Sequence, residues 1–222
     1  MPTFGLITEG LTDQEVVRAV AEGVFGAADT FVNPLQPVAD KTFSHLAGHF
    51  SNWELVLNYC SSPQFADAFA FNDYVIVQID TDRCEEPAFG VPKFEADRSL
   101  DPFEIAWRTA LVIMGRIDPS VARTFGERVL FAISVETIEC WLLPLYALGD
   151  QRRKHLNCLN ALNRALRKRN ETPISPDAKD PRRYSALAEP YTHRRNIETA
   201  RGANVSLDLF VRQLESARDN VE

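Results

Sequence analysis

Residues 3–20 read TFGLITEGLTDQEVVRAV, a short apolar run followed at once by a helical pattern. The run Thr3 to Thr8 is typical of a buried strand and stops at Glu9-Gly10. Thr12 and Glu15 have the spacing of a capping box, and valines and alanines at helical intervals continue the pattern over several turns. The chain is therefore expected to begin with a strand, a tight glycine turn and a helix.

Two later apolar runs have the same character. Residues 74–79 (YVIVQI) lead into Asp80-Thr81-Asp82, and residues 129–135 (VLFAISV) lead into Glu136. Continuous apolar runs of this length are typical of strands covered on both faces. A weaker strand is expected at 30–35, helices at 12–26, 51–59, 65–71, 101–117 and 138–148, and a loop at 83–100. This alternation predicts an α/β fold with a mainly parallel central sheet flanked by helices.

Charge divides the chain into two parts. Residues 151–222 hold 15 Lys and Arg against 9 Asp and Glu, a balance of +6, which leaves 9 basic and 22 acidic residues before them, a balance of −13. We expect an α/β domain over 1–149 and a basic, helical C-terminal extension over 150–222 that packs on it. Either the extension binds a polyanion and the front part a cation, or the two parts attract each other.

The composition is 45% hydrophobic and 25% charged, as in ordinary globular proteins, which excludes disorder as the default state. No apolar run is long enough to span a bilayer and no signal peptide is evident, so a cytoplasmic protein without membrane contact is expected. The cysteines are scattered without a C-x-x-C pair, which argues against a structural zinc site or a disulfide framework. Each is expected to be a small buried side chain: Cys60, Cys84, Cys140 and Cys158.

Acidic residues follow three of the predicted strands, namely Glu9, Asp80 with Asp82, and Glu136. Because the carboxyl ends of parallel strands share one edge, we expect these acids to meet in a crevice there, with Asp13 in the first turn of the following helix. Crowded carboxylates raise one another's pKa unless a cation neutralises them, and oxygen ligands suit Mg²⁺ or Mn²⁺.

Each acid also has a plainer interpretation. Asp13 could complement a helix dipole, Asp80 and Asp82 could form a turn, and Glu136 and Glu139 could be solvated acids at a helix start.

These acidic segments resemble a known family. Phe4 to Asp13 (FGLITEGLTD) resembles the first motif of TOPRIM domains, and Asp80-x-Asp82 after an apolar strand resembles the second. Ser134-x-Glu136 is similar to the third acidic motif of TOPRIM nucleases of the overcoming-lysogenization-defect type. The resemblance implies a Rossmann-like core. Members of the family include topoisomerases, primases and nucleases, which act on phosphodiesters with Mg²⁺.

The resemblance also implies roles for the acids. Glu9 would be the general acid/base or a metal ligand, Asp80 and Asp82 metal ligands, and Asp13 with Glu136 ligands of a second metal. The nuclease branch carries a lysine late in the domain, for which only position suggests Lys154 or Lys168.

The function expected from these patterns is a stand-alone Mg²⁺- or Mn²⁺-dependent phosphodiesterase that acts on DNA or RNA, in bacterial defence or RNA processing. The extension would contact the phosphate backbone through Arg152, Arg153, Lys154, Arg164, Arg167 and Lys168. One alternative is another metal-dependent enzyme with D-x-D after an apolar strand, such as a phosphatase or a nucleotide-sugar transferase. A second is a non-catalytic docking or regulatory module with the TOPRIM fold. Besides nucleic acid, a homodimer or a partner protein stays open as a partner.

Overall fold

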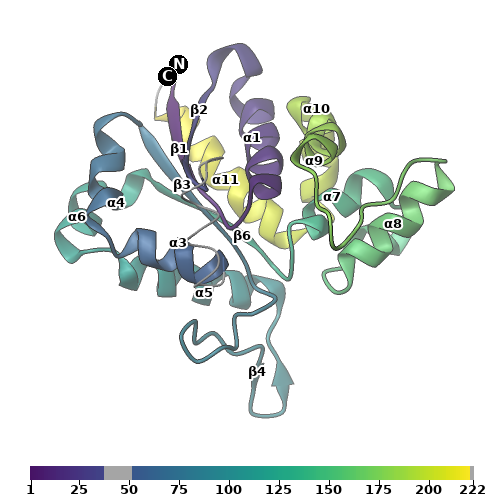
Figure 1. Cartoon of the computed structure of the whole chain (residues 1–222), viewed down its shortest axis with the longest axis horizontal. Helices are drawn as coiled ribbons and strands as arrows, with labels where there is room; N and C mark the ends of the chain where they lie inside the picture. Colours follow the sequence, from purple (N-terminus) through teal and green to yellow (C-terminus); the bar gives the residue numbers. More distant parts are fainter. Residues whose placement is uncertain (38–51, 221–222) are drawn as a thin grey trace.

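The computed structural model describes residues 1–37 and 52–220 and has a parallel sheet at its centre (Figure 1). The four strands of this sheet have the order β2-β1-β3-β6, and every neighbouring pair is parallel. They are β1 (Thr3–Ile7), β2 (Phe31–Gln36), β3 (Tyr74–Asp80) and β6 (Val129–Ser134). The predicted α/β fold with a mainly parallel sheet is therefore confirmed.

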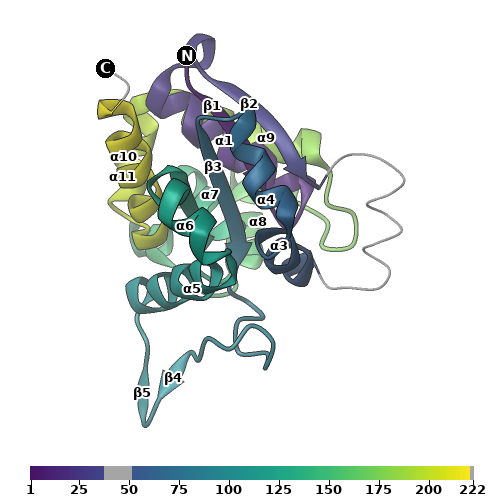
Figure 2. The same cartoon turned by 90° about the vertical axis from the view of Figure 1, so that its left-hand side faces the viewer.

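Helices cover both faces of the sheet. On one face lie α1 (Leu11–Phe25) and α11 (Val205–Asp219), with α7 (Glu139–Tyr146), α8 (Cys158–Lys168), α9 (Pro181–Ala188) and α10 (Arg194–Arg201) beyond them. On the other face lie α3 (Asn52–Cys60), α4 (Pro63–Asp67), α5 (Pro102–Arg116) and α6 (Pro119–Phe125). A small antiparallel hairpin, β4 (Phe94–Glu95) and β5 (Arg98–Ser99), projects from the body (Figure 2). Within the described residues, no helix is long and apolar enough to cross a membrane.

The apolar run of β3 supplies both halves of the core. Its residues alternate, so that Tyr74 and Ile76 pack with α1 and α11 while Val75, Val77 and Ile79 pack with α3 and α5. Because both faces are covered, polar residues at alternate positions would be buried, and the strand is almost continuously apolar.

The C-terminal helical region belongs to the same core as the strands. Leu207, Phe210 and Leu214 of α11 are fully buried in the cluster that contains Phe4 and Ile76. Side chains of α11 in the C-terminal region thus pack directly against one face of the sheet.

Several helix ends differ from expectation. The capping box predicted at Thr12 is wrong, because α1 begins at Leu11 and its N-cap is Gly10, without a side-chain cap. Gly10 leaves room for Asp13, since a Cβ there would lie 2.9 Å from Asp13 Oδ2. The box at Asp101 is present. The predicted helix start at residue 51 lies outside the described residues.

The segment 118–128, for which the sequence predicts neither helix nor strand, contains α6 and a 3-10 turn. Asp118 caps α6 by accepting hydrogen bonds from the backbone N–H groups of Ser120 and Val121. The 3-10 turn of this segment is Gly126–Arg128, and others lie at Ala27–Asp29, Ala68–Ala70, Gly149–Arg153 and Glu189–Thr192.

The expectation that the cysteines form no disulfide is wrong for one pair. Cys140 at the start of α7 and Cys158 at the start of α8 are bonded, with a Cα–Cα distance of 5.0 Å. They are 18 residues apart, so no local spacing in the sequence signals the pair, and the packing of α7 against α8 brings them together. The expected burial of all four cysteines is confirmed, with Cys60 and Cys84 free.

Candidate active site

The strand order contains a reversal between β1 and β3. The chain leaves β1 for β2 on one side and then crosses to β3 on the other side. In open parallel sheets, ligands bind outside the carboxyl ends of the strands at this kind of switch point. Glu9 follows β1 and Asp80 ends β3, so both acids lie at the switch point.

Hydrogen bonds tie the ends of β1 and β3 together. The backbone N–H of Asp80 donates to Glu9 Oε1 at 2.6 Å. The buried Gln78 accepts from the N–H of Glu9 at 3.1 Å and donates to Asp80 Oδ1 at 2.9 Å. The N–H of Ile138 donates to Asp80 Oδ2 at 3.3 Å. Glu9 and Asp80 are thus in the close proximity that their positions in the sequence predict.

The acids after β3 and β6 are interlocked through the backbone. The N–H of Asp82 donates to the carbonyl of Glu136 at 3.1 Å, and the N–H of Glu136 donates to Thr81 Oγ1 at 2.9 Å. Glu136 has a positive φ of 67°, a left-handed conformation that turns the chain at the end of β6. Lys93 reaches from the hairpin loop to Glu136 Oε1 at 2.7 Å.

Two further charged residues join this group. Glu139, at the start of α7, is only 1% exposed and accepts hydrogen bonds from Lys179 Nζ at 2.8 Å and from the hydroxyl of Tyr184. Asp13, in the first turn of α1, is 6% exposed. The interpretation of Glu139 as a solvated acid is therefore wrong. We call Glu9, Asp13, Asp80, Asp82, Glu136 and Glu139 the carboxylate cluster.

Lys179 cannot be identified from the sequence. It lies in the connection before α9, a segment without a motif, whereas the positional candidate Lys168 lies on α8 and Lys154 just before it. Its role becomes visible only in the structure, where the connection before α9 brings Lys179 to Glu139.

The environment of the carboxylate cluster favours protonated carboxyl groups. Burial, with the charge of Asp13 added, raises the pKa of Glu9 to about 8. Burial also raises the pKa of Asp13 to about 7, with Lys179 opposing the shift. Burial and the nearby acids raise the pKa of Asp80 well above its ordinary value, and burial and Glu136 raise that of Asp82. At neutral pH, the cluster therefore needs protons or a cation to offset its charge.

Glu139 differs from Glu9, Asp13, Asp80 and Asp82. Burial acts to raise its pKa, but the ammonium of Lys179 and the hydroxyls of Thr137 and Tyr184 together outweigh burial and lower it. Glu139 and Lys179 therefore form a charged pair at the rim of the cluster.

Metal-binding capacity can be assessed from the donor atoms. Among the described residues, no three His, Cys, Asp or Glu side chains already form an arrangement that could hold a metal ion. Glu9 and Asp80 both accept hydrogen bonds from backbone N–H groups. Ser134 Oγ, opposite Asp80 in the β3–β6 register, is buried and has no hydrogen-bond partner in the described structure. The donor set is made of hard oxygens, which fits Mg²⁺ or Mn²⁺ in chemistry.

The predicted phosphate-binding residues differ in their surroundings. Arg152 is partly buried and donates to the backbone carbonyls of Pro144 and Thr199, both at 3.0 Å. The others are exposed and have no ion pair with any described residue: Arg153, Lys154, Arg164, Arg167 and Lys168. We call these five residues the basic surface.

The remaining arginines of the C-terminal region pair mainly with acids of the same region. Arg194 and Arg201 both contact Glu215, and Arg201 also contacts Asp208 at 2.6 Å. The pair Lys179–Glu139 joins this region to the acidic front part. The five residues of the basic surface are therefore not held by ion pairs with described acids of the front part.

No known family, no curated protein and no solved structure matches this chain. Its fold and site define an α/β protein with a carboxylate cluster at the switch point of a parallel sheet.

Proposed function

We propose that this protein is a divalent-metal-dependent phosphodiesterase that cleaves nucleic acid with a TOPRIM-like core. The observation that carries the proposal is the meeting of Glu9 and Asp80 at the switch point, with Asp82 and Glu136 interlocked beside them. These are the acids, in the same chain order, on which the resemblance to TOPRIM nucleases depends.

The metal would be held by the carboxylate cluster. The resemblance assigns one Mg²⁺ or Mn²⁺ to Asp80 and Asp82, and a second to Asp13 with Glu136. Burial raises the pKa of both Asp80 and Asp82 and neighbouring acids add to the rise, so a cation that neutralises these buried carboxylates would be favourable. Divalent cations would supply the positive charge that an in-line displacement at phosphorus requires.

The chain's own residues would handle the proton and the substrate charge. In the metal-free protein, Glu9, with its pKa raised to about 8, holds a proton at neutral pH, and in the reaction it would act as the general acid for a leaving oxygen. Lys179 is 37% exposed, so its ammonium can contact a substrate phosphate while it remains paired with Glu139.

The basic surface supports nucleic acid as the substrate. The disulfide fixes the start of α8 beside Cys140, the residue that follows Glu139. The unpaired cations on and before α8 therefore begin close to the carboxylate cluster, where they would bind the backbone on either side of a cleaved bond.

The test is a cleavage assay with plasmid DNA, single-stranded DNA and structured RNA, in Mg²⁺, Mn²⁺ or EDTA. We expect cleavage that requires the metal and that the double substitution Asp80→Asn with Asp82→Asn abolishes. Asp67→Asn, which changes an exposed acid at the end of α4, is the matched control and should cleave like the wild type.

Other outcomes would contradict the proposal. Hydrolysis of phosphomonoesters or sugar nucleotides without cleavage of any nucleic acid would indicate a different enzyme with the D-x-D motif. No metal binding and no cleavage would indicate an interaction module.

A further inference from the structure

Two hollows lie along α8, apart from the carboxylate cluster. The first, which we call the slot, has a volume of about 310 Å³ between the end of α7 and α8. The second, which we call the trough, has about 570 Å³ and lies at the start of α8. Arg164 lines both, so the slot and the trough are neighbours.

The walls of the slot are largely apolar. Ala161 and Ala165 lie one turn apart on α8 and carry nothing beyond Cβ. Tyr146 and Leu148 from the end of α7 also line the slot. The guanidinium of Arg169 lies over the ring of Tyr146, 5.1 Å from its centre, so a cation–π contact is already present there. An apolar hollow with an arginine and a tyrosine in its wall suits a planar ring, because nucleobases stack on aromatic and guanidinium planes.

The rim of the slot is cationic. Arg164, Lys168 and Arg169 line it, and no acidic side chain of the described residues does. Arg164 and Lys168 belong to the basic surface and have no ion pair there. The ligand that fits has a planar, weakly polar part and a negative group beside it, which is the chemistry of a nucleoside phosphate.

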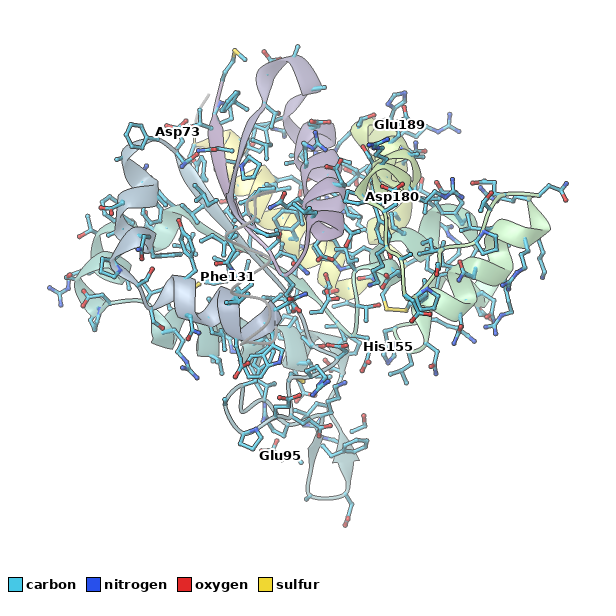
Figure 3. All side chains as sticks on the ribbon, viewed as in Figure 1. Asp73, Glu95, Phe131, His155, Asp180 and Glu189 are labelled. Atoms are coloured by element: carbon cyan, nitrogen blue, oxygen red, sulfur yellow. A yellow bond between two sulfur atoms is a disulfide. The ribbon has the colours of Figure 1, made fainter. Side chains whose placement is uncertain are left out.

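The trough leads from the slot toward the carboxylate cluster. Its lining includes the cations Arg153 and Lys154, one acid, Asp150, and the polar His155 and Asn157, the last of which precedes Cys158. His155 precedes the start of α8, and this end of the helix is the one nearer the middle of the molecule (Figure 3). The disulfide from Cys158 to Cys140 then places this end beside Glu139.

We propose that the slot seats one unpaired nucleotide of the substrate, with its base between α7 and α8 and its phosphate on Arg164 and Lys168. The trough guides the adjoining phosphates toward the carboxylate cluster. This inference rests on the proposed function and deepens it, because it makes a single-stranded segment the preferred substrate.

The experiment measures binding without cleavage. Fluorescence anisotropy with a labelled single-stranded oligonucleotide and with a duplex of the same sequence is recorded in EDTA. Ala165→Leu fills the slot and keeps a good helix former on α8. We expect it to weaken single-strand binding about tenfold, as for the removal of one stacked base, and to leave duplex binding unchanged. Ala186→Leu, at an exposed position of α9, is the matched control and should bind as the wild type does.

A second variant tests the binding of phosphate. Arg164→Ala with Lys168→Ala should weaken single-strand binding and flatten the slope of log affinity against log salt by roughly 0.7 for each phosphate that is no longer neutralised. Competition with a free mononucleotide at millimolar concentration tests whether the slot binds a nucleotide of the oligonucleotide or only a free nucleotide. Displacement of the oligonucleotide supports the slot, whereas mononucleotide binding without oligonucleotide binding overturns the proposal.

The proposal is also overturned if Ala165→Leu binds single strands as tightly as Ala186→Leu does, or if the double variant keeps the wild-type salt slope. Its failure is distinct from that of the proposed function. Slot-dependent binding without any cleavage would contradict only the proposed function, and cleavage that is insensitive to Ala165→Leu would contradict only the slot.

Discussion

Gln78 occupies the point where the two central strands end, between Glu9 and Asp80. It is fully buried. Its side-chain amide accepts a hydrogen bond from the backbone N–H of Glu9 and donates one to the carboxylate of Asp80. A carboxylate at this position would add a further negative charge, while an apolar side chain would leave two polar groups without partners. The amide therefore lets two acids lie close together in a buried site, where burial first and nearby acids second raise the pKa of both.

The pKa of Glu9 predicts how stability depends on pH in the metal-free protein. Its ordinary value of 4.5 is raised to about 8, so the folded state keeps a proton that the unfolded state releases. The associated stability is fully present below pH 4.5 and is lost as pH rises through about 8. In EDTA, urea denaturation should show a free energy of unfolding that falls between pH 5 and pH 8.

Glu9→Gln combined with Asp80→Asn should flatten this profile, whereas Asp67→Asn should keep the wild-type slope. If the stability of the double variant falls with pH as steeply as that of the wild type, then the proton kept by the folded state is not on Glu9 or Asp80.

Lys179 is the subject of a second prediction. Lys179→Met removes the partner of the buried Glu139 and should lower the free energy of unfolding at pH 8 by about 1–3 kcal/mol. The loss stays below that of a fully buried pair because Lys179 is 37% exposed. At pH 5 the loss should shrink, since Glu139 can then take up a proton. The control Lys154→Met should change stability by less than about 0.5 kcal/mol in urea denaturation. Equal losses in both variants would contradict the pairing.

Among the elements, α1 packs unusually close to the 3-10 turn Glu189–Thr192. A Cβ on Gly23 would collide with the carbonyl oxygen of Tyr191, whereas a Cβ on Gly115 of α5 meets nothing within 4 Å. Gly23→Ala should therefore destabilise the protein by about 2 kcal/mol, through overpacking. Gly115→Ala should stabilise it by roughly 0.5–1 kcal/mol, the ordinary helix gain. Thermal melts of the two variants should move in opposite directions, and a shift of the same sign would disprove the close contact.

The disulfide between α7 and α8 is expected to stabilise this pair of helices. It closes a loop of 18 residues, for which the loss of unfolded-state entropy corresponds to about 3 kcal/mol. Cys140→Ala with Cys158→Ala should lower the free energy of unfolding by about that amount and expose the bonds after Arg152 and Arg153 to trypsin. Reductant should destabilise the wild type and leave the double variant unchanged. Equal sensitivity of both to reductant would exclude this bond.

Local patterns predict the elements better than the contacts between them. The runs over β1, β3 and β6 are apolar because both faces are covered, and their terminal acids meet because parallel strands end at one edge, so Glu9 and Asp80 were predictable. The pair Lys179–Glu139 and the disulfide depend on how α7, α8 and the segment before α9 pack, and no sequence period encodes that. The predicted capping box at Thr12 is absent because α1 begins at Leu11 and Gly10 is its N-cap. A side chain at Gly10 would crowd the carboxylate of Asp13.

For the whole molecule, a cation that binds only the folded state should raise its stability. At 100 times its dissociation constant, a bound ion contributes about 2.7 kcal/mol. The melting temperature at pH 8 should therefore rise with Mn²⁺ concentration relative to EDTA. Asp80→Asn with Asp82→Asn should abolish the rise and melt above the wild type in EDTA, because it relieves the repulsion between acids. A wild-type melting temperature that ignores millimolar Mn²⁺ would count against the metal site.

The edge of the sheet at β6 is closed by a side chain. The amide of Gln213 on α11 accepts from the N–H of Phe131 at 2.8 Å and donates to its carbonyl at 3.0 Å. It thus supplies both bonds that a further strand would make with this residue. An open strand edge is a template for intermolecular pairing and fibrous aggregation. While α11 stays docked, its Gln213 amide therefore blocks the pairing of a neighbouring molecule's strand at Phe131.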